Sequence, residues 1–464
     1  MIRRYSGLLV ITLVGLFLRL INIDAWPLWT DEALTLVIAQ WPLTTLFFAP
    51  GDPTPGLYYA LHKALLGPYV GVAGARSISV AAGTLLIPAS YFLARKARVP
   101  AHLTAALVAL SFPLIDYSQE ARAYSLLLLL VTVSAGLFLW WVRTERLGLL
   151  AGSLAFGVLA FYTHLAAIFW MGPLALAAIA TGKRRAVPLV LAMAVIATPE
   201  VSRLAEYPTG GFVWLLQASP QQAAHTLAQA VMPFRLSGFL ALALALLLAG
   251  RMWMHRSALI GWVRANQPAA AALLIFLTMP MAIWLFGFIV QPIFMPRTIL
   301  IAVPGFMLAF ALLLSFEHRI VRMAVVGLYA ASLMVTGTMR PREDWRAVAQ
   351  HVGSDALLMC EIGHAVAARH VLGQNSQVLI AYGDGVLDIA GVPWQRAYFE
   401  ALTDEATKSR AARQGQDIAG SLYPVWTVRN GSPETLPAES TTLDEAIRLC
   451  DANHANNAAR YAEE

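Results

Sequence analysis

The sequence has few charged residues and very few cysteines. Charged side chains make up 13% of its 464 residues and hydrophobic ones 58%, whereas an ordinary soluble domain carries roughly 25% charged residues. This balance excludes an ordinary soluble protein and predicts an integral membrane protein. Its two cysteines, Cys360 and Cys450, are too few for a disulfide framework or a zinc site. One bridge between them and two buried free thiols remain as alternatives.

Long apolar stretches dominate the first three quarters of the chain. A membrane span needs roughly 20 apolar residues. The first stretch follows the start MIRRYS, and because no small-residue cleavage site comes after it, we interpret it as a retained anchor rather than a signal peptide. About eleven spans are predicted, near residues 6–23, 74–94, 100–115, 122–142, 147–163, 164–181, 186–203, 237–252, 269–290, 297–316 and 321–339.

The formal net charge of +6 comes from cations in every second loop between these stretches. Cytoplasmic loops of membrane proteins carry an excess of Lys and Arg, so the N-terminus is predicted to be cytoplasmic. An odd number of spans then puts the C-terminus outside. The cations of the inner loops are Arg3, Arg4, Arg95, Lys96, Arg98, Arg143, Arg146, Lys183, Arg184, Arg185, Arg251, Arg256, Arg264, Arg319 and Arg322.

The composition changes near Met339, where the apolar stretches become short. The segments ALLMCEI, SQVLIAY and LYPVWTVRN are typical of strands, and GHAVAARHVL of a helix between the first two. We therefore predict a membrane domain of residues 1–338 and a small extracytoplasmic α/β domain of residues 339–464.

The first outer loop, residues 24–73, is unusually long. Its segments EALTLVIAQWPLTTLFF and GLYYALHKALLG are amphipathic but too short or too polar to span, which indicates helices lying in the membrane interface. Helices that cover the membrane surface in this way suit an enzyme that acts on a lipid-linked substrate. Asp31 and Glu32 begin the first segment, where Thr30 is a good N-cap and acids favour a helix start. A general base at this position is the functional alternative.

Several arginines lie on the outer side, against the inside bias of the other cations. Arg76, Arg122 and Arg297 come from three separate spans, and their convergence predicts a binding site for an anion at the membrane surface. Arg19 lies inside the first span, where an arginine either serves a function or extends to the interface. The predicted substrate-binding residues are Arg19, Asp52, Tyr58, His62, Lys63, Arg76, Glu120, Arg122, Tyr124, His164 and Arg297.

The strings RLINIDAWPLWTDEALT, DPTPGLYYALHKALLGPYVGVAGARSIS, SQEARAYSLLLL and FYTHLA, taken in order, resemble bacterial relatives of the protein O-mannosyltransferases. The lipid A aminoarabinose transferase belongs to the same superfamily. The resemblance covers residues 10–170 and returns in PRTILIAVPGF and REDWRAVAQHV. It implies the GT-C architecture and a sugar donor carried on a polyprenyl phosphate, used outside the cytoplasm without a nucleotide sugar.

The resemblance also implies roles for individual residues. The family's acidic pair falls on Asp31 and Glu32, with Asp31 as the base, and its outer arginines fall on Arg76 and Arg122, which would meet the donor phosphate or order the loops. Two departures stand out. Pro55–Gly56 occupies the place of paired prolines, and Asp52 replaces a lysine of the aminoarabinose transferase, which argues against aminoarabinose as the donor.

We therefore predict an inverting glycosyltransferase of the bacterial inner membrane, with Asp31 and Glu32 as catalytic residues. It would move a monosaccharide from a polyprenyl phosphate to a hydroxyl of a lipid, glycan or protein, with membrane lipid but no nucleic acid as a partner. Arginines can stabilise the leaving phosphate, so no cofactor is predicted. A divalent ion on Glu32, Asp52 and His62 or His164 is the less favoured alternative.

Two other classes of protein remain as alternatives. A flippase for a lipid-linked saccharide would also need outer arginines, but transport normally requires polar residues near the midplane and paired halves. The predicted spans are polar mainly at their outer ends, and the sequence has no internal repeat. A non-catalytic scaffold of an envelope complex would leave Asp31 dispensable.

Overall fold

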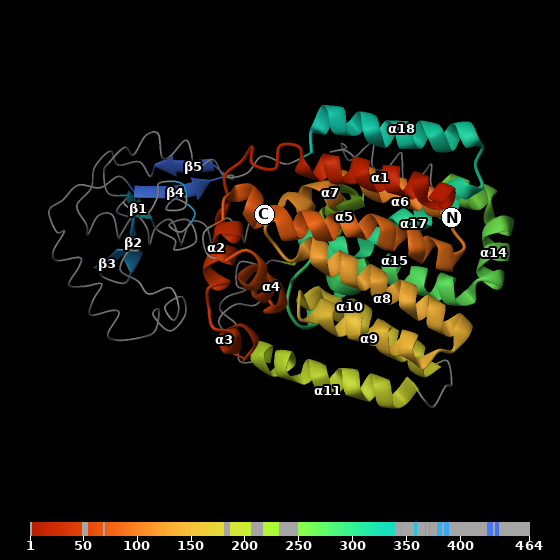
Figure 1. Cartoon of the computed structure of the whole chain (residues 1–464), viewed down its shortest axis with the longest axis horizontal. Coiled ribbons are helices and arrows are strands. Elements are labelled where there is room, and N and C mark those ends of the chain that lie inside the picture. The colour runs from red at the N-terminus through yellow and green to blue at the C-terminus, as the bar shows by residue number, and fades with distance from the viewer. Residues whose placement is uncertain are drawn as a thin grey trace.

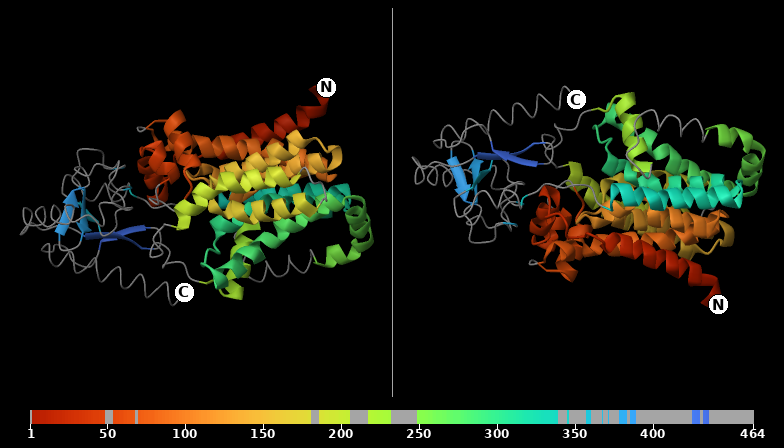
Figure 2. Two further views of the ribbon diagram at one scale, coloured as in Figure 1. Left: turned by 90° about the horizontal axis from the view of Figure 1, so that it is seen from below. Right: turned by 90° about the horizontal axis from the view of Figure 1, so that it is seen from above.

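The computed structural model of the chain is a bundle of long helices with short helices at one end (Figure 1). Strands of a small sheet lie beyond that end (Figure 2). The structure describes residues 2–48, 54–67, 70–180, 186–205, 217–231, 249–338, 345, 357–359, 367, 371, 378–382, 385–388, 425–429 and 432–435.

The bundle consists mainly of apolar helices. Its helices are α1 (Ile2–Leu20), α5 (Val72–Ala97), α6 (Ala101–Leu110), α7 (Phe112–Asp116), α8 (Tyr124–Thr144), α9 (Leu147–Phe161), α10 (Ile168–Ala180), α11 (Ala186–Ala205), α12 (Pro220–Val231), α14 (Arg256–Ala265), α15 (Gln267–Ile289), α16 (Pro296–Ile299), α17 (Val303–Ser315) and α18 (Arg319–Thr336). The first outer loop forms α2 (Thr30–Ile38), α3 (Leu43–Phe48) and α4 (Leu57–Leu65). Single 3-10 turns are η1 (Tyr117–Gln119), η2 (Leu165–Ala167) and η4 (Leu300–Ala302).

This is an α-helical polytopic membrane protein, as predicted. Among the described residues, five helices are long and apolar enough to cross a membrane, and a sixth span results if α6 and the following turn, bent by 64°, count as one. Three shorter apolar helices lie beside them. Every predicted span except 237–252, most of which lies outside the described residues, coincides with a helix or consecutive helices. The positions of the spans along the chain were therefore predicted well, while the count of eleven spans is not confirmed.

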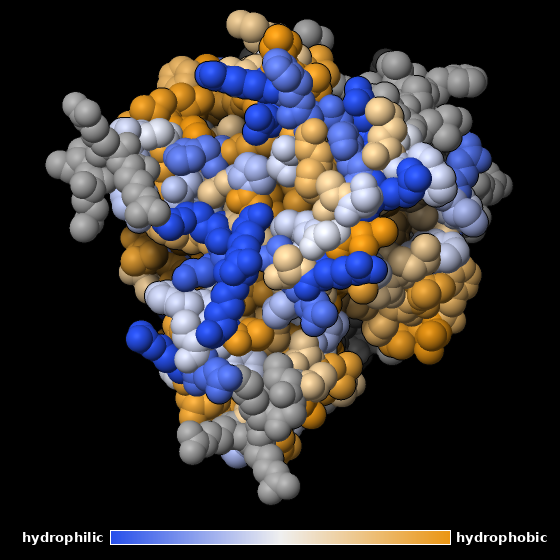
Figure 3. All heavy atoms as spheres, turned by 90° about the vertical axis from the view of Figure 1, so that its right-hand side faces the viewer, coloured by the Kyte–Doolittle hydropathy of each residue, from blue (hydrophilic) through white to orange (hydrophobic). Residues whose placement is uncertain are grey.

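One end of the bundle carries hydrophilic side chains (Figure 3), and its connections contain basic residues. They come from the connections that join α5 to α6 and α8 to α9, and from the region around α14 and the start of α18. One of them, Lys96, places its ammonium 3.8 Å from the centre of the Trp140 ring. The short helices α2, α3 and α4 lie at the opposite end (Figure 1).

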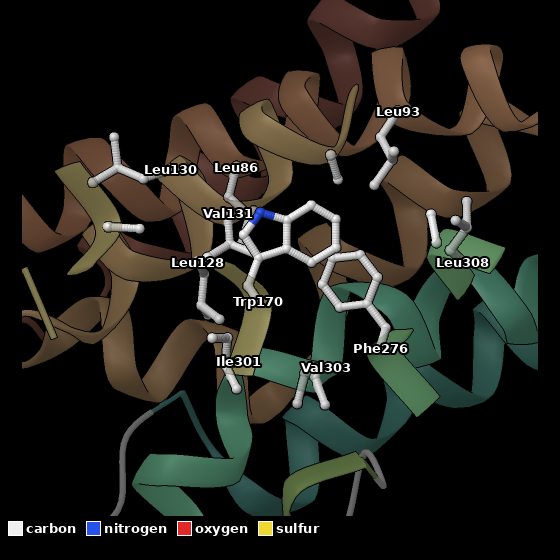
Figure 4. Packing of buried hydrophobic residues seen from close by; sticks show 14 of the residues in the cluster. Leu86, Leu93, Leu128, Leu130, Val131, Trp170, Phe276, Ile301, Val303 and Leu308 are labelled. Atoms are coloured by element: carbon white, nitrogen blue, oxygen red, sulfur yellow. The ribbon is translucent and has the colours of Figure 1, made fainter. Parts of the chain in front are cut away.

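The centre of the bundle is packed by aromatic and aliphatic side chains (Figure 4). Trp170 of α10 stacks on Phe276 of α15, with ring centres 5.1 Å apart. A Cβ atom on Gly305 of α17 would lie 2.1 Å from the Cβ of Phe276, so only glycine permits this approach of α17 to α15. The Trp170 indole donates to Ser134 Oγ at 2.9 Å, and Ser134 and Ser153 donate to each other's carbonyls, which ties α8 to α9.

The C-terminal region contains a five-stranded sheet in the order β3-β2-β1-β4-β5. Its strands are β1 (Leu357–Met359), β2 (Val378–Tyr382), β3 (Gly385–Asp388), β4 (Val425–Arg429) and β5 (Ser432–Thr435). β1 pairs in parallel with β2 and β4, and β3 and β5 add antiparallel edges. β1, β2 and β4 fall within the three predicted strand segments. The predicted helix 363–372, apart from residues 367 and 371, the boundary near Met339 and both cysteines lie outside the described residues.

Candidate active site

The two adjacent acids at the start of α2 have different surroundings. Glu32 is completely buried, and its carboxylate receives two bonds from Arg76 of α5, from Nε at 2.7 Å and from Nη2 at 2.6 Å. It also accepts the backbone N–H groups of Ala121 at 2.7 Å and Trp29 at 3.3 Å. Glu32 therefore joins α2 to α5 and to the turn before α8, and its acceptor positions are occupied by protein donors.

Arg76 is also completely buried, and it connects α5 to the loop that precedes α2. Besides Glu32, its guanidinium donates to the carbonyls of Ile23 at 2.5 Å, Trp26 at 3.2 Å and Pro27 at 3.1 Å. The resemblance implied that Arg76 either meets the donor phosphate or orders the loops, and these contacts support the second role. Trp29, and not the predicted Thr30, is the N-cap residue of α2, because Glu32 satisfies the Trp29 N–H in the manner of a capping box.

Asp31 faces the other way and is partly open to solvent. Its Oδ2 accepts a bond from Arg297 Nη1 at 3.1 Å, and the two side chains are 25% and 27% exposed. No second partner of the Asp31 carboxylate exists among the described residues. The Asp31 carboxylate is therefore engaged by one cation while about a quarter of its side chain stays exposed.

Arg122 brings a second guanidinium to the same place. Its Nη1 lies 3.3 Å from the Asp31 carbonyl, from Thr35 Oγ1 and from the Tyr59 hydroxyl, and its Nη2 lies 3.4 Å from Thr54 Oγ1. These are long bonds to neutral acceptors, which are weaker than charge-assisted ones. Sequence reasoning did not single out Thr35, Tyr59 or Thr54. Thr35 could have been found from its spacing, since it lies one helical turn after Asp31.

His164 lies between α9 and η2 and closes the site from another side. Its Nδ1 accepts the Ala166 N–H at 3.1 Å, which leaves the proton of a neutral ring on Nε2. Burial, and then the charges of Arg122 and Arg297, lower the pKa of His164 from 6.5 to about 3. Its ring lies 5.6 Å from that of Tyr124, which is buried. The site therefore contains a neutral imidazole beside two guanidinium groups.

Other predicted site residues support the surrounding framework. Lys63 of α4 donates to the carbonyls of Gln40 at 2.8 Å and Trp41 at 3.0 Å, just past the end of α2, where a cation is favourable. Buried Tyr58 shares a 2.8 Å hydrogen bond with Ser79 of α5, and burial raises the Tyr58 pKa. His62 is buried against α5, and burial lowers its pKa.

Arg19 is fully buried in the last turn of α1, against the end of α6, and makes no bond to the acids at the start of α2 among the bonds of the described residues. It donates to Ser118 Oγ at 3.2 Å, to the Gly15 carbonyl at 2.9 Å, and to the carbonyls of Val108 and Ala109 at 3.4 Å. The last two belong to the final turn of α6, where the helix breaks and carbonyls lose their intrahelical partners. This geometry supports helix capping, and substrate binding by Arg19 stays a prediction.

Two further predicted residues complete the account. Glu120 is buried next to the joint formed by Glu32 and Ala121. Asp52 lies outside the described residues. Within the part of the chain that the structure describes, no group of three or more His, Cys, Asp or Glu side chains could hold a metal ion.

No family model and no curated protein sequence matches the chain. Solved structures do match. The oligosaccharyltransferase of Archaeoglobus fulgidus tethered to an acceptor peptide superimposes with a TM-score of 0.52 at 12% identity, over 97% of this chain and 78% of that chain. AglB from the same organism, in complex with an inhibitory peptide and a dolichol-phosphate, gives 0.50 at 12% identity, over 97% and 78%. The chain has the GT-C fold.

The GT-C fold confirms the architecture that the sequence motifs implied. ArnT from Cupriavidus metallidurans in the apo state is also similar, with a TM-score of 0.49 and 18% identity over 74% of this chain and 69% of that chain. Within the GT-C fold of this chain, Asp31, Arg122 and Arg297 meet at the end of the bundle that carries α2, α3 and α4. The basic loops lie at the far end (Figure 3).

Proposed function

We propose that the chain is a membrane glycosyltransferase that moves a monosaccharide from a polyprenyl-phosphate donor to an acceptor hydroxyl. The GT-C fold supports this proposal, and so does the complex of AglB with a dolichol-phosphate, a polyprenyl phosphate. The observation that carries it is a partly exposed carboxylate, Asp31, held beside two guanidinium groups from distant parts of the chain.

The arrangement fits a single displacement at the anomeric carbon. The acceptor hydroxyl gives its proton to Asp31 while its oxygen forms the new bond to that carbon. The bond from carbon to phosphate oxygen breaks, and the polyprenyl phosphate leaves with the electron pair, gaining one negative charge. Because attack and departure occur on opposite faces, the configuration inverts. Arg122 and Arg297 would stabilise the charge on the phosphate, and the His164 Nε2–H would add a neutral donor.

The distribution of charge supports a location for the reaction. The connections at the hydrophilic end of the bundle (Figure 3) carry Lys and Arg, and Lys and Arg favour the cytoplasmic side. We therefore assign α2, the site and the sheet to the outer side of a bacterial inner membrane, and the N-terminus to the cytoplasm. An acceptor that is a lipid, a glycan or a protein could approach from this side.

A transfer assay in membranes tests the proposal. Membranes containing the chain are incubated with radiolabelled polyprenyl-phosphate sugars, one donor at a time, and incorporation is compared with that of Asp31→Asn. Loss of a general base costs roughly 100- to 10,000-fold in rate. Asp24→Asn removes an exposed acid from the same outer loop and serves as the matched control, with expected activity near that of the unchanged chain.

The outcomes separate the alternatives. Incorporation that disappears only in Asp31→Asn, with equal amounts of folded protein, supports the proposed reaction and identifies the donor. Equal incorporation by Asp31→Asn refutes its role as the base. If the unchanged chain transfers no sugar from any donor but moves lipid-linked sugar across vesicle membranes, the chain is a flippase and the proposal is wrong.

A further inference from the structure

The contact between Asp31 and Arg297 pairs the proposed base with a proposed phosphate ligand. Arg297 Nη1 donates to Asp31 Oδ2 at 3.1 Å, and about a quarter of each side chain is exposed. In the proposed reaction the carboxylate must accept a proton, and the guanidinium must meet the phosphate. The observed pair engages both groups with each other, so it represents a state that precedes catalysis.

Arg76, at the same end of the bundle, is held differently. Arg76 is buried and makes five bonds to Glu32 and to three carbonyls, so its release would leave a buried carboxylate without its cation. Arg297 follows Pro296 in the four-residue helix α16, and its Nε contacts the Met295 sulfur, a weak acceptor. Because about a quarter of each side chain is exposed, solvent screens this pair more than it screens the fully buried pair of Arg76 and Glu32. Release of Arg297 from Asp31 therefore leaves a partly exposed carboxylate, whereas release of Arg76 from Glu32 would leave a fully buried one.

A phosphate is a better partner for Arg297 than a single carboxylate oxygen. Phosphate oxygens can receive two parallel bonds from one guanidinium, whereas Asp31 offers Arg297 one bond. Arg122, whose Nη1 lies 3.3 Å from the Asp31 carbonyl, would face the same anion. Two cations would then share one phosphate group.

We propose that the donor phosphate takes Arg297 from Asp31, so that donor binding itself releases the base. This inference rests on the proposed function and adds a positioning role for Arg297. Before the exchange, Arg297 occupies the Asp31 oxygen that an acceptor hydroxyl would need. After it, the carboxylate is free to accept the hydroxyl proton, and Arg297 stays with the phosphate as charge develops there. The donor therefore binds before the acceptor.

Equilibrium binding tests the exchange without requiring catalysis. The full chain in lipid nanodiscs is titrated with radiolabelled undecaprenyl phosphate, with undecaprenol as the phosphate-free control. Four proteins are compared: the unchanged chain, Asp31→Asn, Arg297→Gln and the double variant. Glu317→Gln, which removes an acid at the basic end where it pairs with Arg251, controls for a general effect of charge. Thermal unfolding checks that each protein is folded.

Asp31→Asn should bind undecaprenyl phosphate more tightly, because no carboxylate competes for Arg297. In the Arg297→Gln background, Asp31→Asn removes only the repulsion between the carboxylate and the phosphate. The gain in affinity for undecaprenyl phosphate should therefore be smaller than in the unchanged chain. We expect the two gains to differ about threefold to fivefold, the size of a partly exposed pair. Arg297→Gln alone should bind more weakly than the unchanged chain, and Glu317→Gln should bind equally well.

Equal gains in both backgrounds would overturn the exchange, because repulsion alone would then explain the effect of Asp31. The proposed function would survive that result if sugar transfer still depends on Asp31. Binding that does not distinguish undecaprenyl phosphate from undecaprenol would overturn both, since neither can hold without a phosphate site. A kinetic result completes the test: product inhibition should show the donor binding first.

Discussion

Replacement of Arg76 by alanine tests whether the buried pair with Glu32 builds the outer loop. The substitution removes two bonds to the Glu32 carboxylate and three to the carbonyls of Ile23, Trp26 and Pro27. Glu32, which is fully buried, would keep only two backbone donors. Breaking a buried ion pair in this way costs about 3–5 kcal/mol. The bonds to the carbonyls of Ile23 and Trp26 are partly buried and the bond to the Pro27 carbonyl is buried, so their loss adds to this cost.

The measurement is thermal unfolding of the purified full chain in detergent, followed by the transfer assay. At roughly 2–4 °C per kcal/mol, Arg76→Ala should lower the unfolding temperature by about 10 °C. Arg256→Ala is the matched control, because it removes an exposed arginine at the basic end, and its unfolding temperature should stay within about 2 °C of the unchanged chain.

A double variant separates pairing from a general loss of packing. Replacing both Glu32 and Arg76 by methionine removes both charges together and should recover much of the lost stability, because apolar replacements of buried ion pairs are often tolerated. Two results would refute the reasoning. One is an Arg76→Ala protein as stable as the unchanged chain, and the other is a double variant whose loss of stability equals the sum of the losses of Glu32→Met and Arg76→Met measured singly.

Three further predictions concern single side chains. The pKa of His164 is about 3 in the folded chain and 6.5 ordinarily. As the pH falls, the unfolded chain therefore binds the proton first, and the stability of the folded chain decreases from about pH 7 downward. His164→Gln should reduce this dependence of stability on pH, measured by unfolding at a series of pH values. Lys63→Met should cost about 1 kcal/mol in thermal unfolding and lower the transfer rate, because α2 loses its C-terminal cation. Gly305→Ala should destabilise the chain by about 1–3 kcal/mol in the same unfolding assay, because the new Cβ overlaps Phe276.

The helical part of the fold could be predicted from the sequence because apolar length and charged loops are local signals. The spans near α8 and α15 agree with the structure to within a few residues. The break at Ser111 was not predicted, although Pro113 at the start of α7 is a local signal for it. The bonds from Arg19 to carbonyls about 90 residues away in the chain could not be predicted from local patterns. The edge strands β3 and β5 were also missed, because each has four residues and lacks a long apolar run.

The candidate site was predicted in its residue types but not in how they pair. Convergence of three outer arginines followed from span topology, and the structure brings Arg122 and Arg297 to Asp31. Which arginine each acid would bind could not be predicted from the sequence. Glu32 and Arg76 are 44 positions apart, and Asp31 and Arg297 are 266 positions apart, so their pairing depends on the packing of whole helices.

The geometry of α2 explains why Glu32 is buried while the adjacent Asp31 is partly exposed. Consecutive residues of an α-helix point about 100° apart. If one acid of the pair faces α5 and becomes buried, its neighbour must therefore point along a different face. Glu32 has the longer side chain and reaches both the Trp29 N–H and Arg76, while Asp31 remains a quarter exposed beside Arg297. The buried acid fixes the direction of α2, and this direction holds the exposed acid toward the two guanidinium groups. A charge pair with a structural role and one that can exchange thus occupy adjacent residues, because the first orients the second.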